Sequence, residues 1–193
     1  MGIRQSKPKE DSNNVEKFLS KEVTDSKCNM NDHFLRTNHS VESSDVEIDY
    51  VDKVWTDMEV YEGHFVNGLY DGYGELYSVD GSIYKGEFKA GVCHGLGIYM
   101  YFDGDKYEGM FRNGKYDGYG KYTDANGDVF QGDFKEGRRN GYGVSTFKDG
   151  TIYKGNFEHD VESGCGWLQY ADGSVYKGLF KDGQPHSCDS VLS

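Results

Sequence analysis

Hydrophobic and polar residues alternate along much of this chain with a period of two. In the segment IYKGEFK (83–89), the aromatic residues and the glycine fall on one face of an extended strand, and the charged residues fall on the other. Residues 95–102 (GLGIYMYF) form a second segment that is richer in aromatic and apolar residues. Both segments predict β-strands, and their short separation predicts a hairpin.

This pattern repeats every 23 residues, in five full units and one half unit that span residues 61–183. Each unit opens on an aromatic residue, with glycine two positions later and phenylalanine four positions later. Gly-x-Gly follows in each full unit, and Asp-Gly or Asn-Gly ends it. The opening residues and the phenylalanines are Tyr61, Phe65, Tyr84, Phe88, Tyr107, Phe111, Phe130, Phe134, Tyr153, Phe157, Tyr176 and Phe180.

The glycines predict where the chain turns. Asp-Gly before each new unit, such as 103–104, favours a tight type I′ turn. The looser segment KAGVCH (89–94) closes the other end of the hairpin, and we expect Gly91 to adopt a left-handed conformation there. Asp160 takes the equivalent place in the fifth unit, and we expect the turn to persist because aspartate tolerates positive φ.

The paired glycines predict how the strands are stabilised. Glycine weakens a strand unless a side chain packs over its bare backbone, and aromatic rings from a neighbouring strand can do this. Stacked hairpins then make an all-β fold, an elongated single antiparallel sheet with meander connections and about eleven strands. The pattern leaves the pairing register of the hairpins open.

The remaining segments divide the chain. Residues 1–45 are polar and predict a disordered tail. Residues 46–60 are acidic and predict a linker or a degenerate capping strand, residues 61–183 form the repeat array, and residues 184–193 form a C-terminal tail.

The phased motif Tyr-Glu-Gly-x-Phe-x-x-Gly-x-x-x-Gly-x-Gly with a trailing Asp-Gly resembles the MORN (membrane occupation and recognition nexus) repeat. The resemblance covers residues 61–183. It implies an elongated, twisted antiparallel sheet that acts as a scaffold. Members of this family link membranes, organise cytoskeletal or ciliary structures, or precede an enzyme domain such as a phosphatidylinositol-phosphate kinase.

The first residues, MGIRQSK, match the pattern for N-myristoylation, with Gly2 as the acceptor and Ser6 and Lys7 as recognition residues. The alternative is that Gly2 and Ser6 occupy these places by chance. One myristoyl chain gives only marginal membrane binding, so a second contact is needed. Palmitoylation of Cys28 is one candidate, and binding of the repeats to a partner is the one that we favour.

Charge and composition exclude several functions. The net charge of −12 opposes nucleic-acid binding. The four cysteines lack metal-ligand or disulfide spacing, which favours a reducing compartment. No apolar run approaches the roughly 20 residues that span a bilayer. We expect no metal site, no cofactor and no catalytic residues, because the histidines are scattered and the carboxylates lie on repeated solvent positions.

Two ligands remain for the sheet. The twelve repeated rings, as an aromatic face, predict docking of a partner protein in helical or extended form. The opposite face carries Lys85, Lys89, Arg112, Lys135, Lys154, Lys177 and Lys181, a stripe that could hold phosphoinositide headgroups, but interspersed carboxylates favour solubilising cross-strand pairs. Sheet edges offer self-association as a further mode.

Together these observations predict a non-catalytic scaffold tethered to the cytoplasmic face of a membrane, at the plasma membrane or cell cortex. A structural component of a cilium or cortical cytoskeleton without lipid anchoring is the alternative. A regulatory module of a lipid kinase or another enzyme is the third hypothesis.

Overall fold

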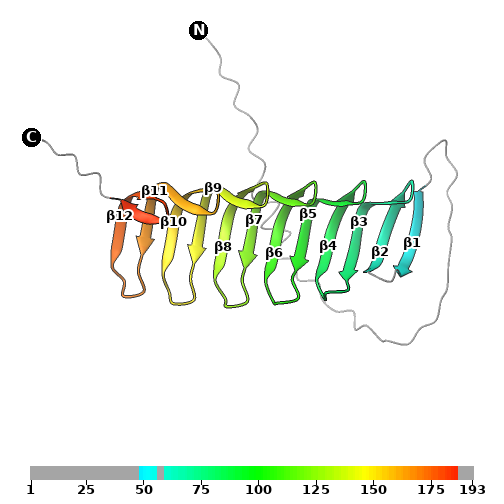
Figure 1. Cartoon of the computed structure of the whole chain (residues 1–193), viewed down its shortest axis with the longest axis horizontal. Helices are drawn as coiled ribbons and strands as arrows, with labels where there is room; N and C mark the ends of the chain where they lie inside the picture. Colours follow the sequence, from blue (N-terminus) through cyan, green and yellow to red (C-terminus); the bar gives the residue numbers. More distant parts are fainter. Residues whose placement is uncertain (1–47, 56–58, 187–193) are drawn as a thin grey trace, which may run out of the picture. The chain divides into compact units, whose positions relative to one another are not determined.

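The computed structural model describes residues 48–55 and 59–186, and the side chains of residues 59–186. This part of the chain contains thirteen strands and no helix. The strands form a single antiparallel sheet in which spatial order follows chain order (Figure 1). The predicted all-β meander is therefore confirmed, whereas the predicted tail over residues 1–45 lies outside the described residues.

Two strands form each hairpin, with the first strand at one edge of the sheet and the last, of three residues, at the other. The strands are β1 Ile48–Trp55, β2 Glu59–Val66, β3 Leu69–Ser78, β4 Ile83–Lys89, β5 Val92–Met100, β6 Lys106–Arg112, β7 Lys115–Thr123, β8 Val129–Lys135, β9 Arg138–Thr146, β10 Ile152–Glu158, β11 Val161–Gln169, β12 Val175–Lys181 and β13 Gln184–His186.

The two kinds of turn are placed differently from the sequence prediction. The tight turns lie within units, where both central residues have positive φ, as in Ala90 (48°) and Gly91 (84°), which is the signature of type I′. Asp-Gly instead belongs to a longer connection, residues 101–105 between β5 and β6, in which only Gly104 (101°) has positive φ. The type I′ assignment to Asp-Gly was therefore wrong, because the aspartate serves another purpose there: Asp103 Oδ1 accepts the backbone N–H of Asp105 at 3.2 Å.

The predictions for Gly91 and for the Asp160 turn are confirmed. Asp160 has a φ of 73° and His159 a φ of 51°, so the fifth unit keeps the same turn without glycine. Aspartate reaches this conformation at lower cost than most side chains because its short polar group can bond locally.

One row of glycines fixes the register of the sheet. Within each hairpin and between hairpins, glycine pairs with glycine, so that a single row crosses the sheet from β2 to β12. Its members are Gly63, Gly74, Gly86, Gly97, Gly109, Gly120, Gly132, Gly143, Gly155, Gly166 and Gly178. The opening aromatic ring of each unit lies over this row. Tyr84 shows why the row must be glycine, because a Cβ atom on Gly97 would lie 2.5 Å from the Tyr84 hydroxyl.

The two glycines of Gly-x-Gly have separate roles. The second belongs to the row beneath the rings. The first has positive φ, as in Gly95 (60°) and Gly118 (111°), and lies where the register shifts within the hairpin. Such a bulge bends its strand and increases the local twist. Sequence reasoning gave both glycines one role because the spacing alone does not separate them.

The tyrosines lie flat along their own strands. Tyr84 Oη donates a hydrogen bond to the Glu87 carbonyl oxygen at 2.8 Å, and Tyr107 Oη donates to the Met110 carbonyl oxygen at 2.9 Å. The ring can reach three residues along only because the intervening residue, Gly86 or Gly109, has no side chain. This geometry explains Tyr-x-Gly.

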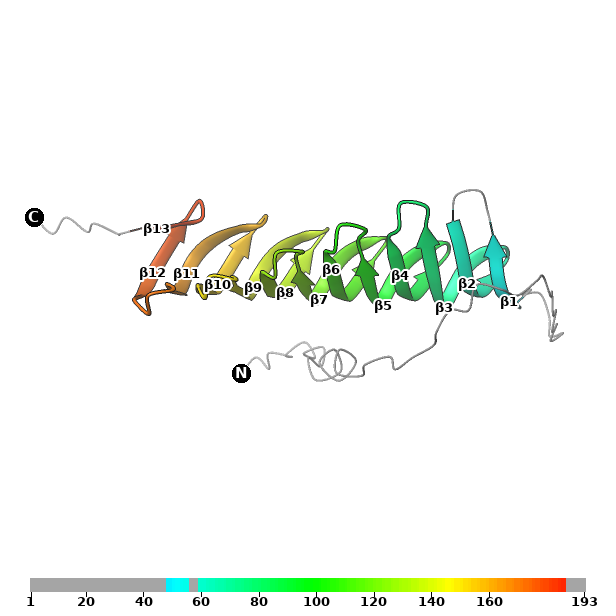
Figure 2. The same ribbon diagram turned by 90° about the horizontal axis from the view of Figure 1, so that it is seen from below.

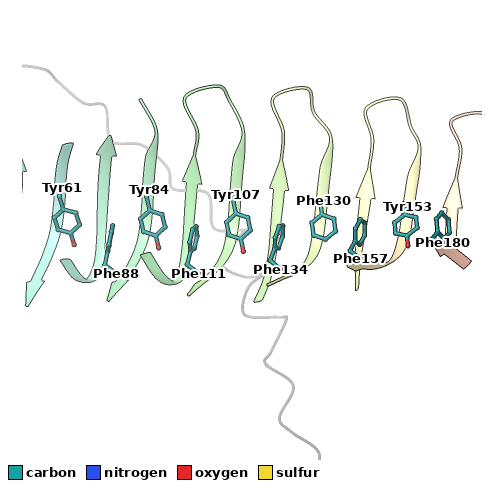
Figure 3. Close-up of a cluster of buried hydrophobic side chains, with 10 residues drawn as sticks. All are labelled: Tyr61, Tyr84, Phe88, Tyr107, Phe111, Phe130, Phe134, Tyr153, Phe157 and Phe180. Atoms are coloured by element: carbon teal, nitrogen blue, oxygen red, sulfur yellow. The ribbon is translucent and has the colours of Figure 1, made fainter. Parts of the chain in front are cut away.

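The phenylalanines complete a continuous ladder of rings. Tyr84 meets Phe88 of its own strand edge-to-face, with ring centroids 4.9 Å apart, and meets Phe111 of the next unit at 5.0 Å. The same T-shaped contact recurs from Phe65 to Tyr176. Figure 3 shows the rings alternating between face-on and edge-on views. Edge-to-face packing is favourable beyond area burial, so the ladder joins neighbouring units energetically.

The sheet is strongly bent toward the ring-bearing face. Tyr70 lies beside the turn at one end of a hairpin and Glu59 lies at the opposite end, about 20 Å away along a flat strand. Nevertheless Tyr70 Oη donates a hydrogen bond to Glu59 Oε1 at 2.6 Å. The strands must therefore curve so that their two ends approach each other, and the curvature is visible along the sheet in Figure 2.

An edge strand lies at each end of the array, and the one at its N-terminal end falls within residues 46–60, for which the sequence predicted a linker or a degenerate capping strand. Residues 48–55 pair with β2 as β1, with a register shift between Val51 and Val54. At the other edge β13 pairs with β12 over three residues, although the sequence placed the end of the array at Gly183. Pro185 lies in β13 and lacks an N–H, which disfavours further strand addition there.

Replacing Gly97 by alanine should destabilise the sheet by about 3 kcal/mol, because the new methyl group overlaps the Tyr84 ring and the strands cannot separate without losing their ladder. Gly114→Ala is the contrasting control: Gly114 has positive φ (76°), which Gly97 does not, but an added Cβ there meets no atom within 4 Å, so the substitution should cost about 1 kcal/mol from backbone strain alone. Urea unfolding followed by circular dichroism measures both. Equal losses for the two variants would contradict close packing beneath the rings.

Candidate functional site: the trough

The bend makes a trough on the ring-bearing face, and its floor is the ring ladder. Ten of the twelve repeated rings are at most 6% exposed, and Phe65 and Tyr176 at the two ends are half-buried. As side chains the ten therefore form the core of the sheet. Docking of a partner on this face stays a prediction, but the side chains that a partner can reach are a second set above the floor.

This second set repeats every 23 residues as well. Each member is the cross-strand partner of a ladder phenylalanine: Tyr70, Cys93, Tyr116, Arg139 and Glu162. Tyr70 stacks on Tyr61 with centroids 3.8 Å apart, and Tyr116 stacks on Tyr107 at 3.7 Å. Sequence reasoning missed this set because its residue types differ between units. The tyrosine that recurs at 70 and 116 was the available signal.

Tyrosine hydroxyls bridge the trough at two places. Tyr70 reaches Glu59, as described above, and the Tyr116 hydroxyl is hydrogen-bonded to the hydroxyl of Tyr101 in the loop before β6. Each bridge joins the tight-turn end of one hairpin to the opposite, loop end of a neighbouring strand. The bridges therefore hold the trough at a fixed width.

Arg139 replaces tyrosine in the fourth unit and lies across the floor in a different way. Its guanidinium carbon is 5.5 Å from the Phe130 ring centroid and 5.0 Å from that of Phe157. Its Nη2 donates to the Asp160 carbonyl oxygen at 2.6 Å, and its Nε lies 3.6 Å from Asp160 Oδ1. The arginine is therefore held between aromatic faces and a carboxylate.

Between the Tyr101–Tyr116 bridge and Arg139 the trough widens into a cavity of about 440 Å³. Two departures from the repeat meet there. Phe130 replaces the usual opening tyrosine, and Ser145 stands where the other units have Leu76, Tyr99, Tyr122 or Leu168. Ser145 is the cross-strand partner of Phe130, and its short side chain has fewer atoms than the leucine or tyrosine of the other units.

Three acidic residues lie among the aromatic side chains that line the cavity. Asp124 and Asp128 lie on the loop side, and Asp160 lies beside Arg139 on the other. Asp124 Oδ1 accepts three backbone N–H groups, those of Asn126, Gly127 and Asp128, each at 2.9 Å. These bonds, foremost the one from Asp128, lower the pKa of the Asp124 carboxyl below its ordinary value. Asp124 is therefore charged at neutral pH.

The opposite face carries the predicted cationic stripe. Lys85 Nζ lies 2.7 Å from Glu75 Oε2, and Arg112 Nε lies 3.3 Å from Asp117 Oδ1. Lys154 lies over the Trp167 ring, 5.1 Å from its centroid. At these positions the cations have neighbours within the sheet, as expected for solubilising pairs. Binding of phosphoinositides stays a prediction.

Other predicted sites have no structural counterpart to describe. Gly2, Ser6, Lys7 and Cys28 lie outside the described residues. Over residues 48–55 and 59–186, no group of three or more histidine, cysteine or acidic residues could hold a metal ion. Within the same ranges, no helix is long and apolar enough to cross a membrane.

Comparison with protein-family models identifies the repeats. The MORN repeat model matches six consecutive segments: residues 61–83, 84–106, 107–129, 130–152, 153–175 and 176–187. The chain belongs to the MORN-repeat family. The last match extends to residue 187 and so includes β13, beyond the predicted end at Gly183. Comparison with curated protein sequences finds no match.

Membership of the MORN-repeat family indicates a repeat-based binding or scaffold role. MORN repeats are generally non-catalytic. In this MORN array the trough, with its aromatic floor and variable second set, is the candidate site for such binding.

MORN-array stability should fall steeply at alkaline pH. Burial, and secondarily the nearby Asp71, raises the pKa of Tyr61 to about 12, and burial followed by Glu162 raises that of Tyr153 to about 12. Because the unfolded tyrosines ionise near pH 10, their contribution is complete below about pH 10 and is lost as the pH rises toward about 12. Urea midpoints and tyrosinate absorbance over this range should change together.

Tyr153→Phe copies the residue at Phe130 and serves as the control. It removes the hydrogen bond to the Asn156 carbonyl oxygen, which should cost about 1 kcal/mol at neutral pH. It should also make the alkaline loss shallower, because one ionising group is gone. Tyrosines that titrate near pH 10 while the circular dichroism spectrum stays unchanged would contradict their role in the core.

Proposed function

We propose that this protein is a non-catalytic scaffold that docks a partner protein in the trough and is tethered to the cytoplasmic face of a membrane by lipid on Gly2. The observation that carries the docking proposal is the set of half-buried aromatic side chains along the trough, including Tyr99, Tyr101, Tyr122 and Phe147. Rigid aromatic side chains on a firm sheet lose little entropy on binding and dominate interface energies.

The shape and charge of the trough favour a polypeptide as the occupant. The bridging tyrosines keep the width of the trough constant, so the binding surface is formed before a partner arrives. Binding therefore does not pay the entropy cost of ordering that surface. The acidic chain, with a net charge of −12, attracts basic partners and repels acidic ones. A basic segment in helical or extended form fits these features best.

Membrane attachment is supported by the MGIRQSK sequence. A myristoyl chain on Gly2 binds membranes marginally, and Arg4, Lys7 and Lys9 add about 1 kcal/mol each on an anionic leaflet. A partner held in the trough and itself attached to the membrane supplies the second contact, because linked binding events raise overall affinity. The plasma membrane or cell cortex is the proposed location.

Site-specific photo-crosslinking tests the docking surface. Benzoylphenylalanine in place of Phe147, in the trough, should capture a partner, whereas the same residue in place of Tyr142, which is 58% exposed on the opposite face, should not. The captured protein, identified by mass spectrometry and purified, should then bind the wild-type protein directly. Capture from Tyr142 alone would place the interface on the other face and contradict the proposal.

Metabolic labelling with alkyne-myristate tests the tether. The wild-type protein should be labelled and Gly2→Ala should not, and the variant should move from the membrane fraction to the soluble fraction. Ser12→Ala, in the same segment but outside the motif, should behave as wild type. An unlabelled wild-type protein refutes lipidation, and detergent-resistant pelleting that survives Gly2→Ala favours a ciliary or cytoskeletal component.

A further inference from the structure

We propose that the cavity in the fourth unit binds a single basic side chain, lysine or arginine, presented by the docked polypeptide. This inference rests on the proposed function, because it names the chemistry of the partner in the trough. The cavity is lined by Ser145 and Phe130 on the floor, Asp124 and Asp128 on one wall, and Arg139 with Asp160 on the other.

The repeat itself shows that this cavity is specific to one unit. Ser145 lies opposite Phe130 on one neighbouring strand and opposite Tyr153 on the other, so it faces the trough. The equivalent leucines and tyrosines of the other units fill this place. A volume of about 440 Å³ remains here, which suits a long side chain together with part of its backbone.

Ser145 supplies a second, independent observation. Its side chain is 3% exposed, and its Oγ has no hydrogen-bond partner. A buried hydroxyl without a partner is costly. At the equivalent positions Leu76 and Leu168 have no hydroxyl, and the Tyr122 hydroxyl donates to Asp105 Oδ2. The unpaired Oγ therefore marks a place where a ligand can donate or accept a hydrogen bond.

The charge around the cavity selects a cation. Asp160 is paired with Arg139, the cationic side chain among the lining residues, whereas Asp124 and Asp128 line the loop side of the cavity. Backbone N–H groups hold both: Asp124 accepts three, and Asp128 Oδ1 accepts that of Lys148 at 2.7 Å. The carboxylates are thus fixed in position, and an acidic guest would be repelled.

Arg139 shows that these surroundings hold a basic side chain. Its guanidinium packs over Phe130 and Phe157 and bonds to Asp160 in the same trough. The cavity also has the Phe134 ring and the carboxylates of Asp124 and Asp128 among its lining residues, which is a comparable combination. A lysine or arginine from a partner would make cation–π and charge-assisted contacts of the same kind.

Nuclear magnetic resonance titration of the full chain tests this site with defined probes. The probes are capped glycine pentapeptides with one central arginine, lysine, glutamate or leucine. Arginine and lysine peptides should shift the Ser145 and Asp128 amide signals in a saturable manner, with a dissociation constant near about 1 mM for one side chain. The glutamate and leucine peptides should bind at least about tenfold more weakly, and added salt should weaken the arginine peptide.

Two variants with matched controls localise the effect. Ser145→Leu restores the residue found at Leu76 and Leu168, so it should fold, fill the cavity and abolish the saturable shifts. Thr146→Leu adds the same side chain at the exposed neighbouring position on the other face and should leave binding unchanged. Asp128→Asn should weaken binding about threefold to tenfold, whereas Asp172→Asn, in the loop between β11 and β12, should have no effect.

Several outcomes would overturn the inference: no saturable shift with either basic peptide, equal binding of the glutamate peptide, or full binding by Ser145→Leu. Concentration-dependent shifts at Ser145 without peptide would show that a second copy of the chain occupies the cavity, which also overturns it. If these tests fail while Phe147 still captures a partner, the scaffold proposal stands and only the side-chain site is lost. If the basic peptides bind but Phe147 captures no partner, the side-chain site stands and the docking of a partner protein in the trough is contradicted.

Discussion

Close approach of bare backbone beneath aromatic rings is the constraint on which this structure depends. A tyrosine that lies flat along its own strand needs glycine two residues on and a second glycine on the paired strand. The ring then covers both glycines and meets phenylalanines on either side. Because every unit repeats this arrangement, a single sheet without a second layer among its described residues still acquires a buried core.

The same constraint produces the trough. Bulges at the first glycine of each Gly-x-Gly bend the strands toward the rings, and bridging tyrosines join the two ends of the bent strands. The ring ladder is thus buried on its open side by side chains of the same sheet. Stability and binding surface arise from different residues: the ladder is nearly uniform along the array, whereas the second set varies from Tyr70 to Glu162.

Much of this fold could be predicted from sequence because its determinants are local and repeated. The period, the strands, the faces of Tyr84 and Phe88, and the turns at Gly91 and Asp160 all follow from residues a few positions apart. The bend does not, because a pattern of period two gives the face of a side chain but not the curvature of the strand. The reversed turn types follow from Asp103, whose carboxylate favours a local Asx bond over a two-residue turn.

The candidate site was harder to predict for a related reason. The twelve repeated rings stand out in the sequence because they recur, and recurrence in a repeat protein indicates core packing. The second set and Ser145 recur in position but differ in residue type from unit to unit. They can be recognised only by comparing the equivalent positions of neighbouring units. The net charge argued against nucleic acid as a ligand, but the pairing of Ser145 with Phe130 depends on a register that the pattern leaves open.

Hydrogen bonds between successive hairpins have a consequence for how such a chain can change in length. The Gly91 amide donates to the Tyr70 carbonyl oxygen, and Gly114 donates in the same way to Cys93, so each tight turn is fastened to the hairpin before it. Each later hairpin donates from its tight turn to the hairpin before it. It accepts, at the equivalent carbonyl oxygen, from the tight turn of the hairpin after it. Duplication or excision of a whole 23-residue cassette would therefore preserve all junctions, and gene-level tandem copying could lengthen or shorten the binding surface without inventing a new interface.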